Sequence, residues 1–99
     1  MEVLYRDQRL ALIETDRAAI ETRLPIAVIS AYQRKLPVLR AATDERTLRN
    51  WKSLHYEKLA GDREGQRSIR LNDQWRMVFT IDTACHPNRI TVLAIEDYH

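Results

Sequence analysis

The sequence predicts an α+β fold in which N-terminal helices pack on one face of a C-terminal antiparallel sheet of about four strands. Two observations lead to this prediction. Apolar residues recur at spacings of three and four before Trp51 and alternate after it, which is helical and then strand periodicity. With 99 residues, of which 44% are apolar, the chain has the size and core of one domain. Segregated helices and strands are typical of α+β folds, so we expect residues 1–99 to form a single domain.

The sequence indicates two short elements in the N-terminal part of the chain. Residues 2–6 fit either a short strand or an irregular lead-in. Residues 7–14 predict a short helix that carries Leu10 and Ile13 on one face.

The longest helix is expected to begin near Pro25, because the fixed φ of proline suits a first helical position. Its apolar face is formed by Ile29, Tyr32, Leu36 and Leu39. Pro37 lies inside this pattern and is expected to kink or split the helix. A further short helix is expected over residues 44–51, with Thr43 as its N-cap and Asp44 beside its positive end.

The second half predicts strands separated by turns. The strands are expected, in order, at residues 54–58, 68–72, 75–81 and 90–95. Turn residues at 61–65 and 72–73 and a proline-containing loop at 82–88 separate them. With helices on one face, the other face of this sheet is expected to be open.

Composition narrows the class of protein. The chain has 16 Lys and Arg against 14 Asp and Glu, and this balance excludes a disordered polyelectrolyte while permitting nucleic-acid binding. The basic set is 13 Arg and three Lys, which favours phosphate recognition or reflects a general preference for Arg. Cys85 is the only cysteine, so we expect no internal disulfide. The sequence has no CxxC and no paired His/Cys spacing, so we expect no zinc site, and we expect no other cofactor. No leader-like or membrane-spanning apolar run is present, so a soluble, cytoplasmic protein is expected.

Arg70 and Arg76 are the first candidate site residues. They lie on successive strands joined by a tight turn that contains Asn72, so the register can bring them to one face. Two convergent guanidinium groups can bind a phosphate and stabilise the charge of a phosphoryl transition state. The alternative is that both arginines are solvated or paired with nearby carboxylates, namely Asp73, Glu96 or Asp97.

The C-terminal residues Asp97, Tyr98 and His99 are the second candidate. His and Asp can transfer protons, and Tyr can hydrogen-bond a phosphate or stack on a base. The alternative is a frayed, inert terminus. His55, Lys58 and Arg63 can line the same cleft, although a single His near a strand is more often structural or exposed.

These motifs together resemble the HigB branch of the RelE/ParE toxin superfamily. The resemblance rests on the run Gly61 to Phe79, which holds a Gly-Asp turn, Ser-Ile-Arg and Asn-Asp-Gln-Trp-Arg, and on the closing Glu-Asp-Tyr-His. It implies a microbial-ribonuclease-like fold and a ribosome-dependent RNase that cleaves messenger RNA. It also implies a HigA-type helix-turn-helix antitoxin as partner, with operator DNA bound only through that antitoxin.

The resemblance further implies the roles of individual residues. It assigns the active site to Arg70, Asp97, Tyr98 and His99, and a phosphate-binding role to Arg76. The RNA- or phosphate-binding candidates are completed by Asn72, Lys58 and His55. Two alternatives remain: a non-nuclease toxin that binds a protein target, as gyrase poisons do, and a degenerate toxin that only binds its antitoxin.

Overall fold

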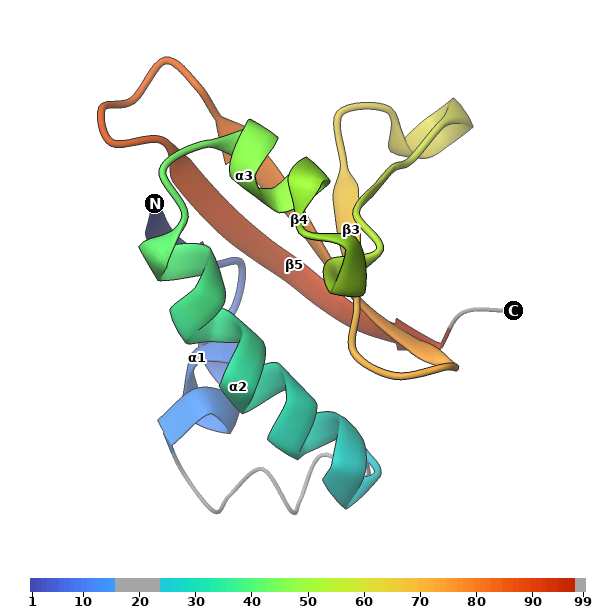
Figure 1. Ribbon diagram of the computed structural model, residues 1–99. Coiled ribbons are helices and arrows are strands. Elements are labelled where there is room, and N and C mark those ends of the chain that lie inside the picture. Colours follow the sequence, from blue (N-terminus) through green and yellow to red (C-terminus); the bar gives the residue numbers. More distant parts are fainter. Residues whose placement is uncertain (16–23, 98–99) are drawn as a thin grey trace.

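The computed structural model describes residues 1–15 and 24–97, which form a mixed sheet with helices packed against one side (Figure 1). In chain order the described elements are β1 (Glu2–Tyr5), α1 (Gln8–Thr15), α2 (Ile26–Ala41), α3 (Glu45–Asn50), η2 (Lys52–Leu54), β2 (Glu57–Lys58), η3 (Gly61–Arg63), β3 (Arg67–Arg70), β4 (Trp75–Asp82) and β5 (Arg89–Asp97). The strand order across the sheet is β1-β5-β4-β3-β2. The predicted α+β class is confirmed.

The sheet differs from the prediction in having five strands, one of them parallel to its neighbour. β1 pairs parallel with β5, in a register that runs from Glu2 opposite Arg89 to Tyr5 opposite Val92. Residues 2–5 are therefore a strand and not an irregular lead-in. Local periodicity does not reveal this pairing, because a parallel neighbour is reached only through a long crossover connection.

The strand expected over 54–58 is wrong in its first half. Leu54 ends the 3₁₀ helix η2 and is fully buried in the core. His55 then adopts φ 48°, a left-handed backbone conformation that turns the chain toward the edge of the sheet. Only Glu57 and Lys58 pair with β3. The apolar Leu54 that suggested a strand is instead the anchor of a helical turn.

α2 runs without interruption from Ile26 to Ala41, so of the two expectations for Pro37, a kink or a split, the split is wrong. Pro37 removes one backbone donor, but Leu36 and Leu39 on either side of it are fully buried. Their packing holds the last turns of the helix against the sheet. Within residues 1–15 and 24–97, no helix is long and apolar enough to span a membrane.

α3 is capped by Asp44 and not by Thr43. The Asp44 carboxylate accepts a hydrogen bond from the Thr47 backbone N–H at 3.0 Å. The Thr43 hydroxyl instead lies 3.2 Å from the Thr47 hydroxyl. The helix ends at Asn50 and passes directly into η2 through Trp51.

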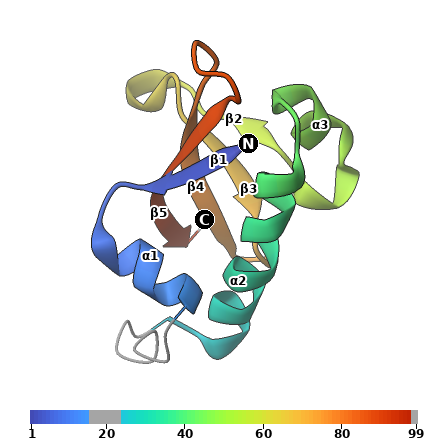
Figure 2. The same cartoon turned by 90° about the vertical axis from the view of Figure 1, so that its left-hand side faces the viewer.

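The core lies between the sheet and the helices. Figure 2 shows α2 and α3 on one side of the sheet and η3 on the other. The fully buried residues of the core include Val28, Tyr32, Leu36, Leu39, Leu48, Leu54, Ile69, Met77, Phe79, Ile90 and Val92. The segment 59–66, which contains η3, covers part of the second face of the sheet, so that face is not fully open.

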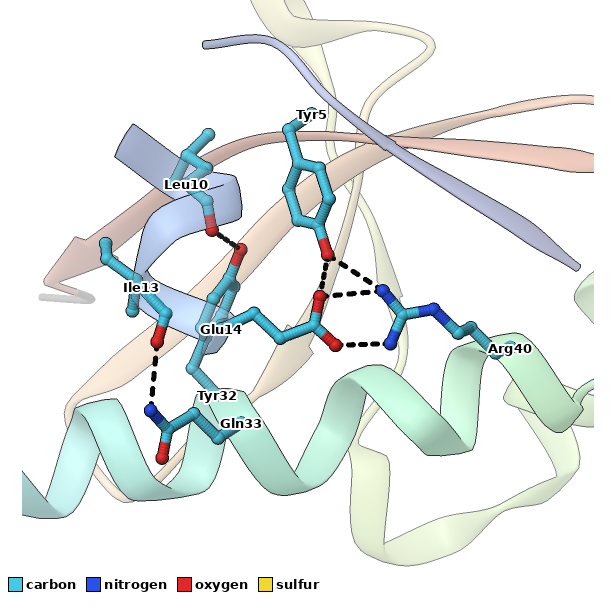
Figure 3. A network of polar contacts seen from close by, with 7 residues as sticks. All are labelled: Tyr5, Leu10, Ile13, Glu14, Tyr32, Gln33 and Arg40. Atoms are coloured by element: carbon cyan, nitrogen blue, oxygen red, sulfur yellow. Dashed lines mark hydrogen bonds and ion pairs between the residues drawn. The ribbon is translucent and has the colours of Figure 1, made fainter. Parts of the chain in front are cut away.

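A polar network joins β1, α1 and α2 at the edge of this core (Figure 3). The Tyr5 hydroxyl donates to Glu14, and Arg40 donates to the Glu14 carboxylate at 2.7 Å and to the Tyr5 hydroxyl at 2.9 Å. Burial and the neighbouring Glu14 raise the pKa of Tyr5 to about 12. The Arg40 guanidinium holds the pKa of Glu14 below its usual value.

Two further bonds in Figure 3 tie α2 to α1. The buried Tyr32 hydroxyl donates to the Leu10 carbonyl at 2.8 Å, and the Gln33 side-chain amide donates to the Ile13 carbonyl at 2.9 Å. Leu10 and Ile13 are also buried, as the predicted helix over 7–14 required. α1 is therefore attached by its apolar face and by its carbonyls.

Candidate functional site

The register between β3 and β4 brings the two candidate arginines together. Arg70 lies directly opposite Arg76 across the hairpin. Side chains of directly opposed residues in an antiparallel pair lie on the same face of the sheet. The structure thus confirms that the two guanidinium groups share one face, the face away from α2 and α3.

Arg70 makes three contacts. Its Nε donates to the Asn72 carbonyl at 3.2 Å, its Nη1 lies 3.1 Å from His55 Nε2, and its Nη2 forms an ion pair with Asp73. Asp73 was one of the carboxylates considered as a partner, and its side chain is 97% exposed. Exposed ion pairs contribute little free energy, so an anionic ligand can replace the Asp73 carboxylate at modest cost.

Arg76 is held more firmly. It is only 8% exposed. Its Nε donates to Ser68 Oγ at 2.8 Å, its Nη2 donates to the His55 carbonyl, and the Glu57 carboxylate lies 3.6 Å away. Because its donors are bound by Ser68 and by the His55 carbonyl, the Arg76 guanidinium fixes the position of His55 and also contributes positive charge to the site.

His55 connects the two arginines. Its ring contacts Arg70 and its carbonyl accepts from Arg76. A guanidinium group can only donate, so His55 Nε2 faces a donor of Arg70 at 3.1 Å. The structure thus brings His55 to the arginine pair.

Lys58 is not brought to the same place. It lies opposite Arg67 in the register, on the helix-covered face of the sheet. Its Nζ is 3.7 Å from the Glu45 carboxylate of α3, which also contacts Arg67 at 3.2 Å. Lys58 therefore lies on the other side of the sheet from Arg70 and Arg76.

Asn72 and Asp97 lie at the turn end of the hairpin. The Asn72 side chain accepts from the backbone N–H groups of Gln74 and Trp75 at 2.9 and 2.8 Å, which fixes the turn. Asp97, at the end of β5, lies opposite Trp75 and accepts from the Gln74 side chain at 3.0 Å. Tyr98 and His99 lie outside the described residues, and their roles stay predictions.

A pocket of about 220 Å³ lies beside Arg76. It is lined by Leu59, Arg63, Ser68, Arg76, Val78, Glu96 and Asp97. Arg63 forms an ion pair with Glu96 and donates to the Gln66 side chain at 3.1 Å, which holds the 59–66 segment over β5. The Glu96 carboxylate raises the pKa of Arg63.

Several residues of this site were not among the predicted ones. Ser68 and Glu57 bind Arg76, and Gln74 binds Asp97. Alternation along the strand already placed Ser68 on the face of Arg70. Arg63, which binds Glu96 and lies in the glycine-bounded turn over 61–65, was a candidate for the cleft, whereas Glu57 reaches the site through the pairing of distant segments, which no sequence signal identified.

The arrangement combines cations with groups that transfer protons. The two guanidinium groups can hold a phosphate, while the imidazole of His55 and the carboxylate of Asp97 can accept a proton. Within residues 1–15 and 24–97, no three His, Cys, Asp or Glu side chains are grouped so as to hold a metal ion.

Solved structures show the same fold. A YoeB/ParE toxin from Agrobacterium tumefaciens matches with a TM-score of 0.62 and 15% identity over the full length of both chains. A YoeB–YefM complex from Staphylococcus aureus matches with a TM-score of 0.61 and 18% identity, covering 100% of this chain and 97% of that one. YafQ from E. coli matches with a TM-score of 0.58 and 9% identity, covering 97% and 91%. At these identities the likeness establishes the fold.

Sequence comparison is more specific. The toxin HigB-1 of Vibrio cholerae serotype O1 is 39% identical over 56 residues, which span 57% of this chain and 59% of the relative. The family model described as the RelE-like toxin HigB of type II toxin–antitoxin systems matches residues 5–99. Because that match includes nearly the whole chain, the protein belongs to the HigB family of RelE-like toxins.

Proposed function

We propose that this toxin is a metal-independent endoribonuclease that cleaves messenger RNA on the ribosome and so inhibits translation. The observation that carries the proposal is the cluster of Arg70, Arg76 and His55 on one sheet face, with Asp97 beside it. Family membership supports a toxin, and the cluster supplies the groups that RNA cleavage requires.

The chemistry is a transesterification. A base removes the proton of the ribose 2′-OH, the 2′-oxygen forms a bond to phosphorus, and the bond from phosphorus to the 5′-oxygen breaks as an acid protonates that oxygen. Arg70, with Arg76 behind it, stabilises the additional charge on the phosphate oxygens. Asp97 or His99 serves as base or acid, and Tyr98 orients the RNA.

The contacts of Arg70 support its role at the phosphate. Its exposed partner Asp73 can be displaced, whereas Asn72 and His55 keep the guanidinium oriented toward the face of the sheet. A phosphate can therefore replace a carboxylate on Nη2 without a change in the position of the side chain.

The test is growth after induced expression, combined with 5′-end mapping of cellular messenger RNA. Arg70→Ala and deletion of His99 should each abolish growth arrest and cleavage, because each removes a proposed catalytic group. Arg34→Ala, which neutralises an exposed arginine of α2, should leave both unchanged. Full arrest by Arg70→Ala at equal expression would contradict the assignment. Arrest with intact messages and damaged DNA would instead indicate a protein-binding toxin.

We further propose a HigA-type helix-turn-helix antitoxin as the partner, with operator DNA bound only through it. The solved YoeB–YefM complex supports this proposal, because a protein of the same fold is held there by a partner. Co-purification of the toxin with the product of the neighbouring gene should give a complex that binds operator DNA. The isolated toxin should not bind that DNA.

A further inference from the structure

Trp51 is the feature of the molecule that the proposed active site leaves unexplained. It is the one aromatic side chain of the described residues that is exposed, at 45%. Its backbone is fixed on both sides, because its N–H donates to the Leu48 carbonyl and its carbonyl accepts from Leu54. The side chains of Leu48 and Leu54 are fully buried. The indole is therefore presented outward from a rigid segment.

The indole lines a shallow hollow of about 540 Å³ between α3 and η2. The other lining residues are Thr47, Asn50 and Lys52, whose side chains offer hydrogen-bond donors or a positive charge. Arg46 lies one helical turn before Asn50 and so extends the same surface of α3. We call the surface formed by Arg46, Asn50, Trp51 and Lys52 the Trp51 platform.

The charges of the Trp51 platform are not compensated within the described part of the chain. Within residues 1–15 and 24–97, the exposed side chains of Arg46 and Lys52 make no hydrogen bond or ion pair. The two carboxylates that precede Arg46 in the chain are already engaged, since Asp44 caps α3 and Glu45 contacts Arg67. An exposed indole beside two uncompensated cations matches a nucleobase flanked by phosphates.

The Trp51 platform lies on a different side of the sheet from the arginine pair. α3 packs on the helix-covered face, where its Glu45 contacts Arg67, whereas Arg70 and Arg76 lie on the opposite face. The platform and the arginine pair are joined through η2, because the His55 N–H donates to the Lys52 carbonyl at 3.1 Å and the His55 ring contacts Arg70. Because Trp51 itself contributes no reacting group, the platform fits RNA beside the nucleotides at the cleaved bond and not those nucleotides themselves.

We propose that the Trp51 platform binds ribosomal RNA, with Trp51 stacked on an unpaired base and with Arg46 and Lys52 contacting its phosphates. This inference rests on the proposed ribosome-dependent function, and it adds a docking contact that is separate from the reacting groups. Stacking on the exposed indole contributes to affinity for any base, so the contact does not depend on RNA sequence.

The test is the affinity of the full chain for purified small ribosomal subunits that carry no messenger RNA. The Arg70→Ala chain serves as the parent, so that cleavage does not interfere. Trp51→Ala should weaken binding about tenfold, Trp51→Phe should recover most of it, and Lys52→Ala should weaken it at moderate but not at high salt. Ile26→Ala, which removes an 81% exposed apolar side chain elsewhere, should change nothing.

The outcomes separate this proposal from the proposed nuclease. Unchanged binding by Trp51→Ala would overturn the platform while leaving the nuclease standing. Cleavage of messages by a toxin that does not bind small subunits would also overturn the platform, and the nuclease activity itself would stand. Binding through Trp51 without any cleavage of messages would support the platform and overturn the nuclease. Loss of antitoxin binding alone in Trp51→Ala would show that the surface serves a protein and would also overturn the proposal. Unchanged thermal unfolding of each variant shows that the fold is intact.

Discussion

At the scale of single residues, the position of Arg76 depends on its buried bond to Ser68. Ser68 is 1% exposed, and Arg76 Nε donates to its hydroxyl at 2.8 Å. Ser68→Ala leaves that donor unsatisfied beneath the 59–66 segment, and an unsatisfied buried donor costs about 1–3 kcal/mol. We expect the free energy of unfolding in urea to fall by that amount, and messenger RNA cleavage to weaken because Arg76 and His55 lose their fixed positions.

A matched control for Ser68→Ala is Ser30→Ala in α2. Ser30 also bonds an arginine, Arg34, but that bond is exposed and 3.3 Å long. Alanine favours helices, so the control should change the free energy of unfolding by less than about 0.5 kcal/mol. Equal losses in the two variants would show that the contact with Arg76 has no special importance.

The residues of the site show what sequence can predict at this scale. Alternation places Ser68 and Arg70 on one face, and the tight turn after Arg70 brings Arg76 opposite, so this pair follows from local pattern. The same local pattern could not show on which face Lys58 lies. Lys58 lies on the other face from Arg70 because the register between β2 and β3 places it opposite Arg67. The choice between those faces is made by a long-range pairing, and a shift of one residue reverses it.

At the scale of elements, α3 is short and depends on its cap. Asp44 accepts from the backbone N–H and from the hydroxyl of Thr47, at 3.0 and 3.2 Å. Asp44→Ala should therefore lower the free energy of unfolding by about 1 kcal/mol, as measured by chemical denaturation. It should also reduce affinity for ribosomal subunits, because α3 carries the Trp51 platform.

Thr43→Ala is the informative comparison for Asp44→Ala. The sequence favoured Thr43 as the cap, but its hydroxyl reaches only the Thr47 hydroxyl. We expect Thr43→Ala to cost less than half as much as Asp44→Ala. A larger loss for Thr43→Ala would mean that the predicted cap, and not the observed one, begins the helix.

The choice of Thr43 over Asp44 as the cap was wrong because the two adjacent residues have similar capping chemistry. Thr and Asp are both good N-caps, and Asp is the stronger, so a boundary error of one residue follows directly. The error at 54–58 has another cause. Leu54 is buried by tertiary packing against the sheet, and an alternating pattern of five residues cannot show whether a buried residue belongs to a strand or to a helical turn.

At the scale of the whole molecule, α1, α2 and β1 are joined by charge as well as by the core. β1 pairs with β5, so the network of Tyr5, Glu14 and Arg40 connects both helices to the edge of the sheet (Figure 3). The segregation of helical and strand periodicity was sufficient to predict the fold class. The polar network was not predictable, because its three members are separated in the chain and meet only after β1 has paired.

The dependence of this network on pH gives the last prediction. Arg40 holds the pKa of Glu14 below its usual value of 4.5, so the folded state keeps Glu14 ionised to lower pH than the unfolded chain does. A depressed carboxyl pKa contributes stability that is fully present above about pH 4.5 and is lost as pH falls through the folded pKa.

Glu14→Gln should therefore lower the free energy of unfolding by about 1 kcal/mol at pH 7, a value reduced by the partial exposure of Arg40. As pH falls below about 4.5 the difference between Glu14→Gln and the unmodified protein should shrink, because the unfolded chain then binds a proton at Glu14 that the folded state resists. Glu64→Gln, at an exposed carboxylate, should follow the unmodified protein at every pH. Urea denaturation of the three proteins between pH 3 and 7 measures this directly, and a loss for Glu14→Gln that stayed constant across that range would show that its contribution is packing and not charge.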